Sequence, residues 1–292
     1  MKYIILIPAL ALVPVHGFAQ SPGIELFSSA NAAYTAGQLD SALARVDRAI
    51  ALEPGLAQAF KLRGDIHQRQ HRHDAALADY KTSEQLDAGA PRLYVSRSAL
   101  FITEGKAKAG LREADKALEL APADVDAWYN RAWALYQGGD LDAALKSVRK
   151  ALQPSDEFPE ALYLSGVIKG AQYDEEEGAA EISRALAMKP SIPGGLMSLA
   201  VLLFEGKRYQ EAITKFSEVI ATDTTELADA YYYRADCYYN LGDKERACLD
   251  WSRSMRLGEK DAAFIKRNYC DTDATKIPKK PKRQPRKTTI EF

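Results

Sequence analysis

The chain has 292 residues, and its 39 Lys and Arg residues nearly balance its 40 Asp and Glu residues, which leaves a formal net charge of −1. Hydrophobic residues make up 47% of the chain. The apolar run near the N-terminus has roughly a dozen residues, fewer than the ~20 that a membrane-spanning helix needs. We therefore expect no transmembrane span.

Residues 1–19 have the pattern of a secretory signal peptide. Lys2 precedes the apolar run, and Gly17 and Ala19 place small residues three and one positions before a cut ahead of Gln20. An uncleaved anchor is the alternative, but the run is short and two prolines interrupt it. No cysteine follows the run, which argues against a bacterial lipoprotein. We expect a periplasmic or secreted protein, cleaved between Ala19 and Gln20.

From residue 20 to residue 258 the chain is built from one repeated pattern with a period of 34 residues, and once 35. The eighth and twentieth residues of every unit are small, and the fourth is always large and apolar. Three such columns in phase indicate a repeat array. The seven units begin at Gly23, Ala57, Pro91, Val125, Pro159, Pro193 and Ala228.

Each unit has the pattern of two helices joined by a turn. Position 15 carries the turn residue, and glycine suits it because many helices end in a left-handed residue. Helices of about a dozen residues are marginal alone, so their stability must come from neighbours. Small residues at positions 8 and 20 allow the two helices to approach closely. Glycine occupies position 15 as Gly37, Gly105, Gly139 and Gly242.

This arrangement resembles the tetratricopeptide repeat, a helix-turn-helix unit of 34 residues. The resemblance implies an all-α fold, a right-handed superhelical solenoid of seven repeats. The fifth repeat departs most from the family pattern, with Lys169 at position 11 and Tyr173 in place of the turn glycine.

Residues 259–270 are predicted to form a single capping helix, because the last hairpin of a solenoid would otherwise expose an apolar face. Residues 271–292 are predicted to be a disordered basic tail, since a segment rich in proline and cations cannot build a core. The repeat body between the two termini is acidic. The cations of the tail are Lys276, Lys279, Lys280, Lys282, Arg283, Arg286 and Lys287.

Two interpretations of the tail stay open. It is either a solvated terminus or a segment that binds anionic lipid or another acidic polymer of the cell envelope. Nucleic acid would attract the same charges, but export and the lack of interleaved aromatic residues argue against it. No nucleic-acid partner is expected.

The sequence offers little material for catalysis or metal binding. His67 and His71 are four residues apart, a spacing that can place two imidazoles on one helical face. His67 falls at a packing position and His71 at the turn, and no carboxylate has the right spacing to complete a tetrahedral set, although Asp74 is close. A metal site there is the disfavoured alternative. We find no phosphate loop, nucleophile elbow or paired-carboxylate motif, and we expect neither an enzyme nor a cofactor.

Three cysteines lie near the C-terminal end of the repeat array. In an oxidising compartment, Cys248 with Cys270 is favoured over Cys237 with Cys248, because the capping helix should pack on the last repeat. Three buried thiols without a disulfide are the alternative.

The resemblance implies that positions 2, 5, 6, 9, 12 and 13 of each first helix line a concave groove that binds a partner. Aromatic side chains are common interface anchors, and we expect them to be exposed there. The groove candidates are Phe27, Asn31, Tyr34, Tyr129, Asn130, Trp133, Tyr136, Tyr163, Met197, Phe204, Tyr232, Tyr233 and Tyr239.

Two other columns of the array bear on binding. Family members that grip a chaperone's terminal carboxylate use Lys at position 5 and Asn at position 9, but Lys61 is followed by Asp65 here. That clamp is absent.

Arginine recurs at position 7, where we expect ion pairs between repeats with partners such as Asp79 and Asp250. These arginines are Arg63, Arg97, Arg131 and Arg234.

The sequence therefore predicts a non-enzymatic scaffold or adaptor of the bacterial cell envelope. Its aromatic groove would bind a segment of another envelope protein. An attachment module that uses the basic tail is the alternative.

Overall fold

The computed structural model describes residues 21–222 and 225–278. The expected signal peptide and the part of the predicted tail from residue 279 onward lie outside these residues. Residues 271–278, which were predicted to be disordered with the rest of the tail, are placed by contacts of Ala274 and Ile277 with the last repeat, so the prediction is wrong for them. Within the described ranges the chain forms fifteen α-helices and one short π-helix and no strand, which confirms the all-α fold. The chain divides into two compact units, residues 1–88 and 89–292, which we describe separately.

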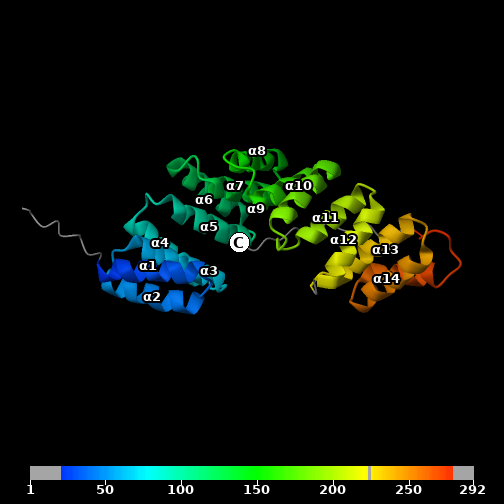
Figure 1. The fold of residues 1–292 in the computed structure, drawn as a ribbon, viewed down its shortest axis with the longest axis horizontal. Coiled ribbons are helices and arrows are strands. Elements are labelled where there is room, and N and C mark those ends of the chain that lie inside the picture. Colours follow the sequence, from blue (N-terminus) through cyan, green and yellow to red (C-terminus); the bar gives the residue numbers. More distant parts are fainter. Residues whose placement is uncertain (1–20, 223–224, 279–292) are drawn as a thin grey trace, which may run out of the picture. The chain divides into compact units, whose positions relative to one another are not determined.

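The first unit holds two helix pairs, coloured blue to cyan in Figure 1. Val46, Leu62 and Ile66 form its core together with small residues such as Ala30 and Ala42, all of them buried. The four helices are α1 (Pro22–Thr35), α2 (Leu39–Leu52), α3 (Ala57–Arg69) and α4 (His73–Leu86).

The second unit holds five helix pairs and a C-terminal cap, and consecutive helices pack on one another (Figure 1). The first helices of its pairs are α5 (Pro91–Thr103), α7 (Val125–Gly138), α9 (Pro159–Ala171), α11 (Gly195–Glu205) and α13 (Leu227–Asn240). The second helices are α6 (Ala107–Leu120), α8 (Leu141–Leu152), α10 (Glu175–Met188), α12 (Tyr209–Thr222) and α14 (Lys244–Arg256).

The small residues at positions 8 and 20 lie where the two helices of a pair meet. A Cβ atom on Gly166 would lie 2.6 Å from the carbonyl oxygen of Gly178, and a Cβ atom on Gly178 would lie 2.7 Å from that of Gly166. In the third repeat the hydroxyl of Ser98 donates to the carbonyl of Gly110 at 2.8 Å. No larger side chain fits between backbones at these distances, which explains both columns.

Position 15 has a left-handed backbone in every repeat. The four glycines predicted there have φ values between +70° and +85°. The other three repeats adopt the same conformation without glycine, at His71 (φ 57°), Tyr173 (φ 66°) and Lys207 (φ 61°). The packing of the two helices therefore imposes the left-handed turn even where the residue is not glycine. At these three residues the Cβ atom makes that conformation less favourable.

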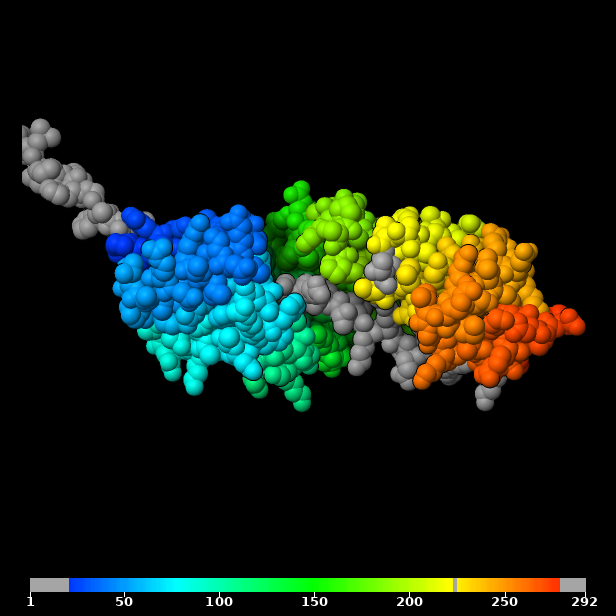
Figure 2. All heavy atoms as spheres, turned by 90° about the horizontal axis from the view of Figure 1, so that it is seen from below, coloured from blue at the N-terminus to red at the C-terminus, as the bar shows by residue number. Residues whose placement is uncertain are grey.

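The cap consists of α15 (Lys260–Ile265) and the π-helix η1 (Lys266–Cys270). Ile265 and Tyr269 pack against Trp251 of α14, and a disulfide joins Cys248 to Cys270. In Figure 2 the red cap lies against the orange surface of the last repeat. Both the cap and the favoured cysteine pairing are as predicted from the sequence.

Candidate binding face on the first helices

We call positions 2, 5, 6, 9, 12 and 13 of the first helices the first-helix face. On α7 this face carries a row of aromatic rings. Trp133 meets Tyr129 and Tyr136 edge to face, with ring centroids 6.5 and 5.5 Å apart. Tyr129 also lies 5.1 Å from the ring of Phe158, in the segment before α9. The contact with Phe158 fixes α7 against the residue that directly precedes α9.

Six of the thirteen groove candidates are buried, so the expectation that they are exposed is wrong. Trp133 is 1% exposed and Tyr163 is fully buried. Consecutive first helices lie so close that a residue at position 5 packs against the first helix of an adjacent repeat. The six are Tyr129, Asn130, Trp133, Tyr163, Met197 and Tyr232.

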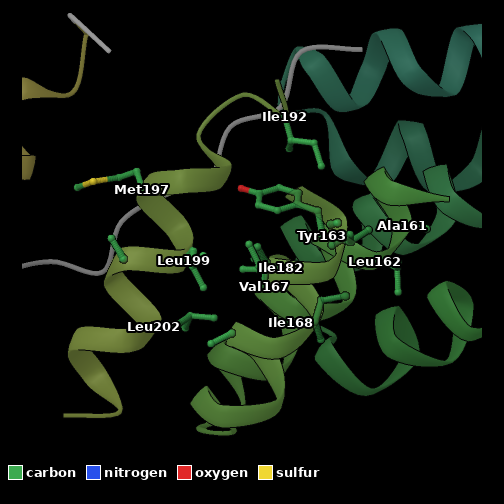
Figure 3. Packing of buried hydrophobic residues seen from close by; sticks show 14 of the residues in the cluster. Ala161, Leu162, Tyr163, Val167, Ile168, Ile182, Ile192, Met197, Leu199 and Leu202 are labelled. Atoms are coloured by element: carbon green, nitrogen blue, oxygen red, sulfur yellow. The ribbon is translucent and has the colours of Figure 1, made fainter. Parts of the chain in front are cut away.

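Tyr163 shows this packing most clearly. Its ring lies in the core between α9 and α11, and its hydroxyl is 3.0 Å from the hydroxyl of Ser198 on α11. Figure 3 shows Leu199 and Leu202 of α11 pointing toward the same core. The ring therefore holds two repeats together.

Polar residues of the same face link one repeat to the preceding one. The side-chain amide of Asn130 donates to the carbonyl of Val95 at 2.9 Å, and that of Gln137 donates to the carbonyl of Ile102 at 3.0 Å. Both bonds join residues 35 positions apart, one repeat plus one residue. The sequence pattern predicted Asn130 as a groove residue and not as a link between repeats, although a separation of about one repeat is itself a signal for such a link.

In the first unit the same geometry involves an arginine. Arg69 donates to the carbonyl of Tyr34 at 3.3 Å, and its guanidinium lies 4.1 Å from the centre of the Tyr34 ring. Burial, with a smaller effect of the Asp65 charge, raises the pKa of Tyr34 to about 12 against the opposing effect of Arg69. This tyrosine stays neutral over the physiological range.

The other groove candidates keep some exposed surface. Phe204 of α11 packs against Tyr209 and Tyr233, with ring centroids 5.9 and 5.6 Å away, and Tyr233 stacks on Phe216 at 5.7 Å. The remaining surface of Phe204 and Tyr233 forms an aromatic patch on α11 and α13, whereas Tyr239 packs against Trp251 and Tyr269 at the cap. Asn31 is exposed, and the half-buried candidates are Phe27, Tyr34, Tyr136, Phe204, Tyr233 and Tyr239.

The position-7 arginines form ion pairs with the predicted partners Asp79 and Asp250, but these pairs lie within one repeat, so the expectation that they join two repeats is wrong for them. Arg63 reaches Asp79 of its own repeat at 2.7 Å and Asp47 of the preceding repeat at 2.9 Å. Arg234 reaches Asp250 of its own repeat at 2.7 Å and the hydroxyl of Ser217 of the preceding repeat at 2.8 Å. Each arginine also lies 5.3–5.7 Å from the position-4 ring of its repeat.

The histidines of the second repeat have separate surroundings. His67 lies 3.7 Å from Asp79, beside Arg63, and burial lowers its pKa. His71 occupies the exposed left-handed turn, with its ring 6.3 Å from that of His73. Within the described ranges, no group of three or more His, Cys, Asp or Glu side chains is placed to hold a metal ion.

Lys61, at the position of the clamp lysine, is engaged within its own helix. Its ammonium group lies 2.7 Å from Asp65, and the Tyr80 hydroxyl donates to the same carboxylate at 2.9 Å.

Across residues 21–222 and 225–278, every helix is too short or too polar to span a membrane.

Comparison with known proteins identifies the repeat. Profiles of the tetratricopeptide repeat match residues 27–91, 100–161, 174–226 and 229–263, well over half of the chain. The chain belongs to the tetratricopeptide repeat family. Family members are generally non-enzymatic, and the fold supports a role as a protein–protein interaction scaffold.

Relatives and solved structures agree with this assignment. DnaJ homolog subfamily C member 3 of Mus musculus is 24% identical over 192 residues, 65% of this chain and 34% of that protein. The chain thus spans about a third of the length of this curated relative.

Two solved structures show the same fold. A tetratricopeptide repeat protein from Parabacteroides merdae covers 82% of this chain and 94% of its own, with a TM-score of 0.58 and 20% identity. PilW, described as a type IV pilus biogenesis factor, covers 72% of this chain and 99% of its own, with a TM-score of 0.65 and 15% identity. At these identities the likeness concerns the fold alone.

Proposed function

We propose that this tetratricopeptide repeat protein is a non-enzymatic adaptor of the bacterial cell envelope that binds a segment of another protein on its first-helix face. Export rests on the signal-peptide pattern of residues 1–19. Binding is non-covalent, and the packed repeats supply a rigid surface that loses little entropy on association.

The aromatic patch on α11 and α13 is the observation that carries this proposal. Phe204 and Tyr233 keep exposed surface on the first-helix face, whereas the rings of α7 and α9 at position 5 are buried. Half-buried rings held by other rings offer contact area with few rotamers to lose. An extended or helical segment with apolar side chains fits such a patch.

A second candidate function rests on the composition of the tail. Seven cations lie between residues 276 and 287. Near an anionic membrane each is worth about 1 kcal/mol, so the tail alone could attach the protein to lipid or to another acidic polymer. The repeat array would then serve as a spacer.

Co-purification from the source cells at two salt concentrations separates the two functions. Tail binding should be lost between 0.1 and about 0.5 M NaCl, because the Debye length falls to a few ångströms. Aromatic binding should survive. Phe204→Ala should then remove the retained partner, while Leu249→Ala, at a half-exposed residue of the outer helix α14, should not. A partner that still co-purifies with the Phe204→Ala variant but is lost at high salt would contradict the adaptor proposal.

A further inference from the structure

The chain that follows the cap returns to the first-helix face of α13. The ammonium group of Lys244 donates to the carbonyls of Thr272 and Ala274 at 2.8 and 3.0 Å. Ile277 packs with the cluster that contains Tyr239, and its amide donates to the Tyr239 hydroxyl at 3.5 Å. Tyr239 occupies position 12, so the described chain ends beside this face.

The face that the chain reaches is acidic. Among the first-helix-face positions of the second unit, Arg92 is the one cation, and it pairs with Asp126 at 2.7 Å. Asp229 and Asp236 lie on α13 itself, on the same side as Tyr232 and Tyr239. The five acidic residues at these positions are Asp126, Glu160, Glu205, Asp229 and Asp236, of which Glu160 also pairs with Lys189 at 2.5 Å and Asp236 is buried.

We propose that the basic segment 279–287 docks on the first-helix face of α13, α11 and α9 as an internal ligand that a partner displaces. This inference deepens the proposed function and rests on it, because it adds a competitor for the same face. The segment carries six cations in nine residues, opposite in sign to the face beside its root.

The reach of the segment fits this placement. Pro281 and Pro285 favour an extended polyproline conformation, which rises about 3.1 Å per residue. Nine residues therefore cover about 28 Å, enough to cross about three packed helices at 8–10 Å each. Because the segment is tethered beside the face, its effective concentration is in the millimolar range, so even weak charge pairing holds it in place.

Docking of the tail would make partner binding a displacement reaction. A partner with apolar side chains would gain the aromatic patch only after the segment leaves. High salt would then weaken the tail first and expose the face. The same segment cannot bind an anionic membrane and its own repeats together, so the two partners compete.

Intramolecular photo-crosslinking in the full-length protein tests this inference without any partner. A photo-reactive residue replaces Gln284, and the crosslinked peptides of the monomer are identified by mass spectrometry. We expect adducts on α9, α11 or α13, and a loss of about fivefold or more when NaCl is raised to 0.5 M. The control Glu245→Gln changes an exposed acid of the outer helix α14 and should leave the yield unchanged.

Two acidic variants test which charges hold the segment. Asp229→Asn and Asp236→Asn should each lower the yield, and circular dichroism of each variant verifies that it folds. Asp229 is half-buried at the start of α13, so its replacement tests the charge even if the buried Asp236 proves structural.

Two results would overturn the inference. Adducts spread over the outer helices, or an adduct yield that does not change with the salt concentration, would each contradict docking on the first-helix face. Vesicles of phosphatidylglycerol at physiological salt should lower the yield, because lipid competes for the segment. An intramolecular adduct without any partner in cells would leave this inference standing and remove the adaptor function alone.

Discussion

Arg234 of α13 donates two hydrogen bonds to the carboxylate of Asp250 on α14, at 2.7 and 3.0 Å. Arg253 adds a third at 3.0 Å, and only 3% of the Asp250 side chain is exposed. The same arginine reaches the preceding repeat through Ser217. One buried carboxylate therefore fixes the last repeat internally and, through its arginine, against its neighbour.

Removing this carboxylate leaves a buried cation without its partner. We expect Asp250→Ala to lower the free energy of unfolding by about 3 kcal/mol or more, and the double variant Arg234→Met with Asp250→Leu to be closer to wild type. Thermal and urea unfolding measure both. Asp115→Ala is the control, because its side chain is 47% exposed and such pairs contribute about 1 kcal/mol or less. Equal losses in both single variants would contradict this reading.

Tyr173 occupies a left-handed turn with 88% of its surface exposed. Tyr173→Gly should raise the free energy of unfolding by about 1 kcal/mol, because glycine adopts this conformation without a Cβ clash. Gly139→Ala, at φ 85°, makes the opposite change and should destabilise by a similar amount. The melting temperatures of the two variants should move in opposite directions, and a lower midpoint for Tyr173→Gly would be inconsistent with strain there.

Trp133 is a core residue of the second unit. Its replacement by alanine should destabilise the protein by about 3–5 kcal/mol, the usual cost of removing a buried aromatic ring. Phe101→Ala, at a half-buried ring of α5, should cost less. Denaturant unfolding compares the two variants. A Trp133 variant with wild-type stability would contradict the core assignment and favour a place for this ring on the binding face.

The disulfide between Cys248 and Cys270 closes a loop of 22 residues around the cap. Loop-closure entropy predicts a loss of about 3 kcal/mol on Cys248→Ser, confined to the cap because repeat arrays unfold locally. Hydrogen exchange of residues 260–270 should accelerate while α5 to α9 stay protected. Cys237, a buried thiol outside the disulfide, supplies the control, since Cys237→Ser should not release the cap selectively.

Glu205 makes the stability of the folded state depend on pH. Burial, with a smaller contribution from the charge of Glu175, raises the pKa of its carboxyl. The folded state therefore binds this proton more tightly than the unfolded state, so this group costs stability above its folded pKa and the cost disappears as the pH falls through it. Glu205→Gln should raise the melting temperature at pH 7, and the difference from wild type should shrink toward pH 4. A difference that grows on acidification would contradict the sign.

The sequence was sufficient to predict the repeats, because the two helices of a pair meet at positions such as those of Gly166 and Gly178, which accept only small residues in every repeat and so produce a periodic pattern. It also identified the partners Asp79 and Asp250 of the arginine column. It did not separate exposed from buried rings. Tyr163 and Tyr136 share the same helical face in the pattern, but only the distance between adjacent first helices decides which ring is enclosed.

The central claim is that the first-helix face binds a segment of another protein. Photo-crosslinking in the source cells tests it most directly, with a photo-reactive aromatic probe replacing Phe204 on α11 and, as the control, the exposed Lys146 on the second helix α8. We expect a discrete protein adduct at Phe204 that is absent at Lys146. Equal adducts at both positions, or none at Phe204 in a folded and exported protein, would contradict the claim.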